Sequence, residues 1–348
     1  MQKKIYYISR NYRSSYDAAG KAKIDCENIF SSLEFQNLGF QRTTIAKAYG
    51  TLLSFLSIGF ALIRLPYKSV LITQYPNSKF RILILWMAKL KACKIVTVVH
   101  DIRTLKKADK KKKNELKYIV TDVIIVHNKV MQSWFIQQGV KSAIFVLNIF
   151  DYLVEELPTQ NKTAAIEDRY KIVYAGGISP KKNPFLYDLD SLITEQFSLN
   201  LYGKGFDESK LSFSNTILDY KGMFPSDAIP YKIVGNFGLV WDGDSLNECS
   251  GILGEYLRFN NPHKTSLYLA SGLPVIIWKD AALAPFIIVN KLGIAIENFK
   301  ELEEQLANMK SADYKALKRN VERFQSKITT GYFLTEAIRK SLEILAKN

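Results

Sequence analysis

The sequence predicts an α/β protein built from two Rossmann-like, doubly wound domains. Short apolar runs rich in β-branched residues alternate with longer stretches of helical spacing, which is typical of parallel sheets wound with helices. The alternation stops near residue 150 and restarts near residue 170. With 348 residues, 47% of them apolar, the chain is long enough for two hydrophobic cores. We therefore expect two parallel sheets whose carboxyl edges face each other across a cleft.

Apolar runs bounded by turn residues are the expected strands, and helices are expected to fill the gaps between them. The predicted strands are residues 5–9, 70–74, 95–100, 123–126 and 143–147 in the first sheet, and 172–175, 199–202, 217–220, 239–241, 275–278 and 293–296 in the second.

Two changes in the pattern set the expected boundaries. Residues 149–169 are polar and acidic without a clear strand, so they are expected to form a linker. We expect a first domain over residues 1–155, a second over 156–325, and a helix over 326–348 that could pack back on the first domain.

The most apolar stretch, residues 52–65, is too short to cross a bilayer. A transmembrane helix needs about 20 apolar residues, and this stretch contains Arg64. We expect either a buried helix or one that lies on a membrane. The first nine residues contain too few apolar residues for a signal-peptide core and predict a strand instead.

Cysteine and histidine usage limits the kinds of site that the chain can build. Cys26, Cys93 and Cys249 are far apart, odd in number and lack metal or redox spacing. They are expected to be structural thiols of a cytoplasmic protein. With three histidines in all, a His-rich metal site is excluded.

The net positive charge of the chain lies entirely in its first half. The net charge is +15, and residues 1–150 hold 25 Lys or Arg against 8 Asp or Glu. The densest run is Lys106, Lys107 and Lys110 to Lys113. This run is either a solvated loop or a contact with phosphates or an anionic membrane at the inner face of the cell membrane. Nucleic acid is disfavoured, because aromatic residues do not interleave with the lysines.

Two motifs of the first half could carry chemistry. Ala19 and Gly20 end a loop where a helix begins, and such a start either binds an anion through backbone N–H groups or is a plain turn. His100 and Asp101 directly follow an apolar strand, at the sheet edge where side chains that transfer protons are commonly placed. His127 resembles a strand-end residue without a role.

Two motifs of the second half could bind a phosphate. Gly176 and Gly177 follow the first strand of the second sheet, and Lys181 comes shortly after them. Further on, residues 260–262 read Asn-Asn-Pro, a typical helix entry. The residues at this entry, where free N–H groups face an anion, are Asn261, His263, Lys264, Thr265 and Ser266.

The stretch from Trp241-Asp242-Gly243-Asp244 through Asn-Asn-Pro-His-Lys to Ala-Ser-Gly-Leu-Pro-Val-Ile resembles the donor-binding region of GT-B glycosyltransferases. More narrowly, it resembles bacterial galactofuranosyltransferases of surface polysaccharide synthesis and the streptococcal glucosyltransferase that extends N-acetylglucosamine on serine-rich repeat adhesins. The Ala-Gly loop, the His-Asp-Ile strand end and residues 174–177 and 220–224 extend this resemblance along nearly the whole chain.

The resemblance implies an acceptor-binding first domain and a second domain that binds a UDP-sugar, with no other cofactor. Lys264 with Asn261, His263, Thr265 and Ser266 would hold the diphosphate and ribose. Lys181 would add a phosphate contact beside Gly176 and Gly177, Tyr220 would lie near the base, and Ala19 and Gly20 would close over the diphosphate.

The expected reaction is an inverting, metal-independent hexose transfer, with Asp101 as the base and His100 as the alternative. Many retaining GT-B enzymes carry a glutamate three residues after this lysine, where this chain has Leu267. Asp242 and Asp244 imitate a metal-binding motif but are interpreted as a structural loop. The expected acceptor is a glycan on a lipid carrier or a protein, and a homo-oligomer is open. The alternative is a non-catalytic GT-B subunit that recognises a glycoprotein acceptor for a catalytic partner.

Overall fold

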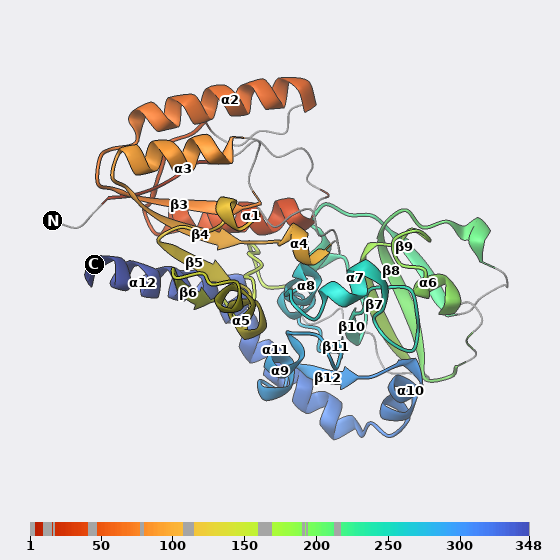
Figure 1. Cartoon of the computed structure of the whole chain (residues 1–348). Coiled ribbons are helices and arrows are strands. Elements are labelled where there is room, and N and C mark those ends of the chain that lie inside the picture. Colours follow the sequence, from red (N-terminus) through yellow and green to blue (C-terminus); the bar gives the residue numbers. More distant parts are fainter. Residues whose placement is uncertain are drawn as a thin grey trace. The chain divides into compact units, whose positions relative to one another are not determined.

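The computed structural model describes residues 4–9, 16, 18–40, 47–76, 80–106, 115–158, 169–189, 192, 194–211 and 217–347 (Figure 1). The chain divides into two compact units: unit 1 is Met1–Asp151 with Gly331–Asn348, and unit 2 is Tyr152–Thr330. The predicted divisions lie at 155/156 and 325/326. The second observed division is later because the helix α11 (Ser311–Thr329) continues without a break to Thr329.

Unit 1 contains a six-stranded parallel sheet in the order β2-β1-β3-β4-β5-β6. Its strands are β1 (Ile5–Tyr7), β2 (Gln36–Asn37), β3 (Val70–Tyr75), β4 (Lys94–Val99), β5 (Val123–Val126) and β6 (Ala143–Val146). The five predicted strands are confirmed to within two residues at each end. The sequence does not predict β2, because two residues carry no periodicity.

Helices cover both faces of this sheet, which is why its strands are nearly continuous apolar runs. Neighbouring side chains on β1 point to opposite faces. Tyr6 packs in a core with α2 and α3, whereas the ring of Tyr7 meets Phe30 of α1. The helices are α1 (Ala18–Ser32), α2 (Lys47–Arg64), α3 (Arg81–Leu90), α4 (Arg103–Lys106), α5 (Lys129–Gln137) and α12 (Tyr332–Lys347).

Unit 2 contains a second six-stranded parallel sheet in the order β12-β11-β10-β7-β8-β9. All six predicted strands are confirmed: β7 (Tyr170–Gly177), β8 (Phe197–Lys204), β9 (Leu218–Gly222), β10 (Phe237–Val240), β11 (Val275–Trp278) and β12 (Gly293–Ile296). The direction of winding reverses between β7 and β10, the switch point at which ligands bind in such sheets. The helices are α6 (Phe185–Asp188), α7 (Gly251–Tyr256), α8 (His263–Ala270), α9 (Ala284–Val289), α10 (Phe299–Ala307) and α11.

The chain passes between the units after Asp151 and again after Thr330. The Asp151 carboxylate accepts hydrogen bonds from the N–H groups of Phe333 (3.1 Å) and Leu334 (2.8 Å), which caps the first turn of α12. α12 then packs against β5, β6 and α1, all in unit 1. In unit 2, the Tyr152 N–H donates to the carbonyl oxygen of Ile328 at 2.8 Å.

Several predicted features fall partly or wholly outside the described residues. Residues 10–15 and 17 of the first loop, residues 159–168 of the expected linker, and Lys107 with Lys110 to Lys113 of the lysine run lie outside them. The three cysteines are buried free thiols. Over the described part of the chain, every helix is too short or too polar to span a membrane.

Candidate active site

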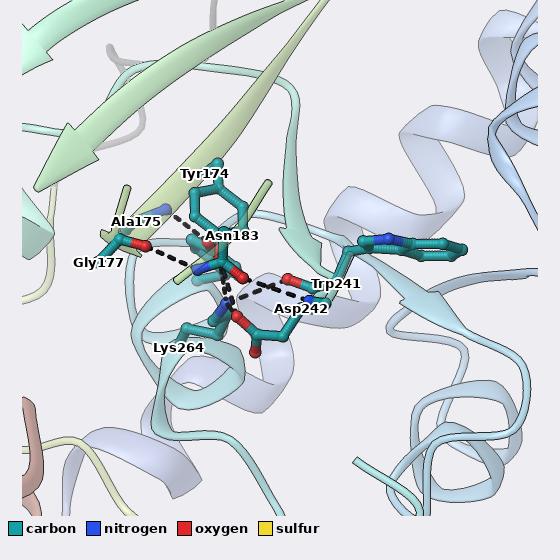
Figure 2. Close-up of polar contacts among 9 residues, drawn as sticks. Tyr174, Ala175, Gly177, Asn183, Trp241, Asp242 and Lys264 are labelled. Carbon is teal, nitrogen blue, oxygen red and sulfur yellow. Dashed lines mark hydrogen bonds and ion pairs between the residues drawn. The ribbon is translucent and has the colours of Figure 1, made fainter. Parts of the chain in front are cut away.

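A cluster of charged and polar side chains lies at the switch point of the unit 2 sheet. Gly176 and Gly177 end β7, and Asp242 follows β10 by two residues. Lys264, the second residue of α8, reaches toward both strand ends (Figure 2). The fold therefore gathers three of the sequence motifs at one sheet edge, as the rule for open parallel sheets predicts.

Lys264 is the centre of this cluster. Its Nζ lies 2.8 Å from Asp242 Oδ1 and 3.0 Å from the Tyr174 hydroxyl, and it donates to the carbonyl oxygen of Trp241 at 3.3 Å. The Tyr174 hydroxyl itself donates to Asp242 Oδ1 at 2.9 Å. Figure 2 shows the lysine, the tyrosine and the aspartate converging on one point.

Burial sets the electrostatics of the cluster. The side chains of Lys264 and Asp242 are only 12% and 15% exposed. Burial lowers the pKa of Lys264, and the charge of Asp242 opposes that shift. Burial, followed by the charge of Asp242, raises the pKa of Tyr174. The tyrosine is therefore a neutral donor, and Asp242 is the counter-ion that keeps a desolvated ammonium charged.

Asn183 ties the two strand-end loops together. Its Nδ2 donates to the carbonyl oxygen of Gly177 at 2.7 Å, and its Oδ1 accepts from the N–H of Gly243 at 3.3 Å. Gly243 has φ +125°, and a Cβ there would lie 2.2 Å from the carbonyl oxygen of Ser250. Only glycine fits this turn, so the backbone of the loop explains the glycine of the Asp-Gly-Asp sequence.

The start of α8 is held against the sheet. The Tyr268 hydroxyl accepts a hydrogen bond from the Ala175 N–H at 2.8 Å, which fixes the helix to β7. The ring of His263 stacks on that of Tyr152, with centroids 4.9 Å apart. The remaining predicted residues of this helix entry are buried: Asn261, Thr265 and Ser266. The Thr265 N–H donates to the Pro262 carbonyl oxygen, so it belongs to the helix start.

Lys181 and Tyr220 stand apart from the lysine cluster. Lys181 is exposed in the loop after β7, and it is the neighbouring Lys182 whose charge lowers the pKa of Lys264. Tyr220, on β9, is 43% exposed and stacks on Phe206. Its hydroxyl donates to the Gly203 carbonyl oxygen at 3.0 Å, which fixes the ring beside the end of β8.

In unit 1, His100 and Asp101 follow β4 as predicted and differ sharply in exposure. His100 is buried, with Nε2 2.7 Å from Gln74 Oε1 and its ring stacked on Phe150 at 5.2 Å. The Asp101 side chain is 27% exposed and pairs with Lys106 of α4 at 2.7 Å. Asp101 is thus the more accessible of the two to a substrate.

His127, which follows β5, supports this strand end. Its ring meets the edge of Phe150, and it hydrogen-bonds to the backbone of Val99 and His100. Burial lowers its pKa to about 4, so it is neutral at pH 7.

Glu115 fixes the other side of the Asp101 loop, and no motif in the sequence points to it. Its carboxylate accepts from the Tyr75 hydroxyl at 2.6 Å and from the N–H groups of Arg103 (2.8 Å) and Thr104 (2.6 Å) at the start of α4. Burial tends to raise the pKa of Glu115, but hydrogen bonds from Thr104 and Tyr75 bring it below its ordinary value. The carboxylate therefore anchors the short helix that carries Lys106.

Ala19 and Gly20 lie in the first turn of α1, as expected for a helix start that follows β1. Lys21, which could have added a free charge there, is buried and pairs with Asp25 at 2.7 Å. Its charge is therefore already compensated within the helix. In the part of the chain that is described, no three His, Cys, Asp or Glu side chains form a group that could hold a metal ion.

The comparisons with known proteins agree with this architecture. Residues 5–149 match the family described as "Glucosyltransferase 3-like, N-terminal domain", and residues 172–341 match "Glucosyltransferase 3-like, C-terminal domain". The β-1,6-galactofuranosyltransferase WbbI of Escherichia coli strain K12 is 31% identical over 346 residues, covering 98% of this chain and 99% of the relative.

Solved structures share the fold at low sequence identity. WaaG, a glycosyltransferase involved in lipopolysaccharide biosynthesis, has a TM-score of 0.55 at 11% identity and covers 98% of this chain and 99% of its own. An α-glucosyltransferase in complex with UDP and a 13-mer DNA has a TM-score of 0.54 at 12% identity, covering 99% and 100%. The chain therefore belongs to the glucosyltransferase 3-like family and is a glycosyltransferase with the GT-B fold.

Proposed function

We propose that this enzyme transfers a hexose from a UDP-sugar to a glycan acceptor by an inverting, metal-independent reaction. The observation that carries the proposal is the buried Lys264 at the switch point of the unit 2 sheet, paired with Asp242 and next to the start of α8. A cation at the N-terminal turn of a helix, where the helix dipole also favours negative charge, can form a site for a diphosphate.

The Asp242 contact gives this lysine a counter-ion before the donor arrives. A diphosphate brings two or more negative charges, so it would share or replace the carboxylate as the partner of the ammonium. Lys182 adds positive charge to the site, because it lies close enough to lower the pKa of Lys264. Both lysines would then stabilise the leaving diphosphate in the transition state.

The nucleotide and the sugar are inferred from relatives. A glycosyltransferase of the same fold was solved with UDP, and the relative from Escherichia coli is a galactofuranosyltransferase. We therefore propose UDP as the nucleotide and glucose, galactose or galactofuranose as the sugar. The half-exposed ring of Tyr220 offers the uracil a stacking surface.

In the proposed reaction, Asp101 takes the proton of the acceptor hydroxyl as its oxygen attacks the anomeric carbon. The bond from that carbon to the diphosphate breaks, and UDP leaves with the electron pair. Leu267 stands where many retaining relatives have a glutamate, which favours inversion. Because Asp242 Oδ1 already contacts Lys264 and Tyr174, the Asp-Gly-Asp loop is better suited to ordering the lysine than to binding a metal.

The acceptor in this proposal is a glycan on a lipid carrier or a protein, in surface polysaccharide or glycoprotein synthesis. A non-catalytic subunit would bind an acceptor without needing a buried phosphate lysine, so the Lys264 cluster favours catalysis.

The test is a panel of UDP-glucose, UDP-galactose and UDP-galactofuranose, read as thermal shift and as donor hydrolysis without acceptor. A ligand that binds only the folded state raises the melting temperature. Lys264→Ala and the longer Lys264→Met should both lose most of the shift and the hydrolysis. The matched control is Lys279→Ala, because Lys279 also forms a 2.8 Å ion pair in unit 2, with Glu297, but on the surface.

A shift in the Lys264 variants equal to that of the wild type would place the donor elsewhere. A wild-type shift with no hydrolysis and no transfer to any acceptor would favour the non-catalytic subunit.

A further inference from the structure

Helix α2 is apolar on both sides, which is unusual for a helix at the surface of a protein. Its inner side contributes Ile58, Ala61 and Leu62 to the unit 1 core, and Leu65, directly after the helix, joins them. Its outer side exposes apolar side chains at intervals of three or four residues: Tyr49, Leu52, Leu56, Phe60 and Ile63. The inner side accounts for the fold, so the outer side requires another explanation.

Helix α3 continues this apolar surface. Ile84, Leu85 and Ala88 are buried, whereas Ile82, Trp86 and Leu90 are exposed on the opposite side at intervals of four residues. Together with the exposed residues from Tyr49 to Ile63 on α2, these three form what we call the α2–α3 outer face. Residues 49–90 carry eleven of the twenty-four exposed large apolar side chains in the described part of the chain. Such a concentration marks an interaction surface.

The two helices form one platform. The rings of Phe55 and Phe80 contact each other with centroids 5.3 Å apart. Beyond the end of α3, Lys91 Nζ donates to the carbonyl oxygens of Leu62 and Leu65, both at 2.7 Å, and so caps the last turn of α2. Figure 1 shows α2 and α3 lying side by side. The outer face is therefore held rigidly rather than made of independent helices.

The segment of the chain that carries this face contains charged residues of one sign only. Residues 35–100 contain nine Lys or Arg and no Asp or Glu. Arg64, Lys68 and Lys89 are exposed near the ends of the two helices, and the Arg64 guanidinium lies 5.1 Å from the ring centroid of Phe60. Long basic side chains can lay their apolar stems on the face while their charged ends reach outward.

The combination of apolar and basic residues selects one partner. A second copy of the chain would bring a face of the same positive charge, which opposes self-association. Nucleic acid would supply negative charge but would leave Ile63 and Leu90 in contact with phosphates. A lipid bilayer with anionic headgroups supplies both a region for the apolar side chains and a compensating charge.

We infer that the α2–α3 outer face docks on an anionic lipid bilayer and holds unit 1 at the membrane surface. The inference goes beyond the proposed function, since it holds whichever sugar nucleotide is the donor. It also assigns the membrane contact to helices α2 and α3 rather than to the lysine run at residues 106–113. An acceptor on a lipid carrier would reach unit 1 by diffusion in the plane of the bilayer.

The test is co-sedimentation with vesicles of phosphatidylcholine alone or mixed with phosphatidylglycerol. The wild type should bind the mixed vesicles and bind phosphatidylcholine far more weakly. Changing Ile63 and Trp86, which are 78% and 57% exposed, to Gln should reduce the partition coefficient by about tenfold or more. The matched control changes Ile288 and Val289, exposed apolar residues of unit 2, to Gln. That control should bind as the wild type does.

A second readout locates the contact. Vesicles that contain brominated lipid should quench tryptophan fluorescence of the wild type, and Trp86→Phe should still bind but lose most of the quenching. Trp241 and Trp278 are buried and should not report on the lipid, and Trp134, half-buried on α5, lies outside the α2–α3 outer face and should contribute little. Unchanged melting temperatures of the variants would show that they are folded.

Three outcomes would overturn the inference. The first is wild-type binding by the Ile63 and Trp86 double variant. The second is loss of binding on neutralising Lys110 to Lys113, with no effect of the double variant. The third is absence of wild-type binding to the mixed vesicles. A dimer, measured by light scattering, that the double variant dissociates would then make a second copy of the chain the partner.

Discussion

The ring of Tyr152 stacks on the imidazole of His263, with centroids 4.9 Å apart and the planes inclined by 24°. Tyr152 is the first residue of unit 2 and His263 the first of α8, so the stacking joins the chain entry to the proposed donor helix. The Tyr152 hydroxyl donates to the Ser226 carbonyl oxygen, which fixes the far end of the ring.

We therefore expect Tyr152 to position His263 for the donor. Tyr152→Ala should remove most of the thermal shift produced by UDP, because the imidazole loses the surface that orients it. Tyr152→Phe keeps the ring and should retain the shift, with a slightly lower melting temperature from the lost hydrogen bond. If the Ala and Phe variants respond equally to UDP, the stacking has no part in donor binding.

Chelation of metal ions should leave sugar transfer essentially unchanged. Lys264 and the N–H groups of α8, rather than a divalent ion, are proposed to balance the charge of the leaving diphosphate. The measurement is turnover in EDTA, before and after addition of magnesium or manganese, with Asp244→Asn as a companion variant. Activity lost in EDTA and restored by either ion would instead assign Asp242 and Asp244 to metal binding.

Asp101→Asn should fold and bind donor normally but lose transfer by about 10²-fold or more if Asp101 is the general base. Asparagine keeps the size and most of the hydrogen bonding of aspartate while removing its proton affinity. Single-turnover transfer assays would measure the loss, with the UDP thermal shift as the internal control. Near-normal turnover of Asp101→Asn, combined with loss in His100→Ala, would make His100 the base.

Asp151 should give the protein a pH-dependent stability in the range from about 4 to 7. Burial raises its pKa from 3.8 to about 7, despite the opposing hydrogen bonds from Leu334 and Phe333, and nearby Asp25 adds to the shift. The folded state therefore binds this proton more tightly than the unfolded chain does. Its contribution is fully present below pH 4 and is lost as the pH rises to 7.

The comparison that isolates this group is urea unfolding of the wild type and Asp151→Asn at pH 5 and pH 8. The free energy of unfolding of the wild type, relative to the variant, should fall by roughly 2 to 3 kcal/mol over this range. His127, whose pKa is lowered to about 4, has the opposite pH dependence, but it is present in both proteins and cancels. Parallel pH profiles of the two proteins would contradict the prediction.

The strands can be predicted from the sequence because parallel strands buried on both faces are continuous apolar runs of the kind seen at residues 123–126 and 275–278. Lys264 can be predicted as a site residue because it follows a recognisable helix entry. Its partners cannot: Tyr174 and Lys264 are 90 residues apart, and only the pairing of β7 with β10 brings them together. Asp242 stands out in the sequence, but it does so as part of an apparent metal-binding motif and not as a partner of Lys264.

The residues that hold the strand ends cannot be predicted for a related reason. Glu115 and Asn183 are polar residues in loops, and nothing local distinguishes them from solvated ones. Their importance comes from the backbone groups that they satisfy, Arg103 and Thr104 in one case and Gly177 and Gly243 in the other. Such contacts depend on the path of a loop, which periodicity does not determine.

The placement of α12 in unit 1 has a consequence for the order of events on the ribosome. Residues 331–348 belong to unit 1 but are synthesised after the whole of unit 2, residues 152–330. At about 5 to 20 residues per second, the face of β5 and β6 that α12 covers waits roughly 10 to 40 s for its partner. Unit 2 is uninterrupted and can fold first. Asp151 is synthesised early, but its carboxylate can accept hydrogen bonds from the N–H groups of Phe333 and Leu334 only after α12 has packed onto unit 1.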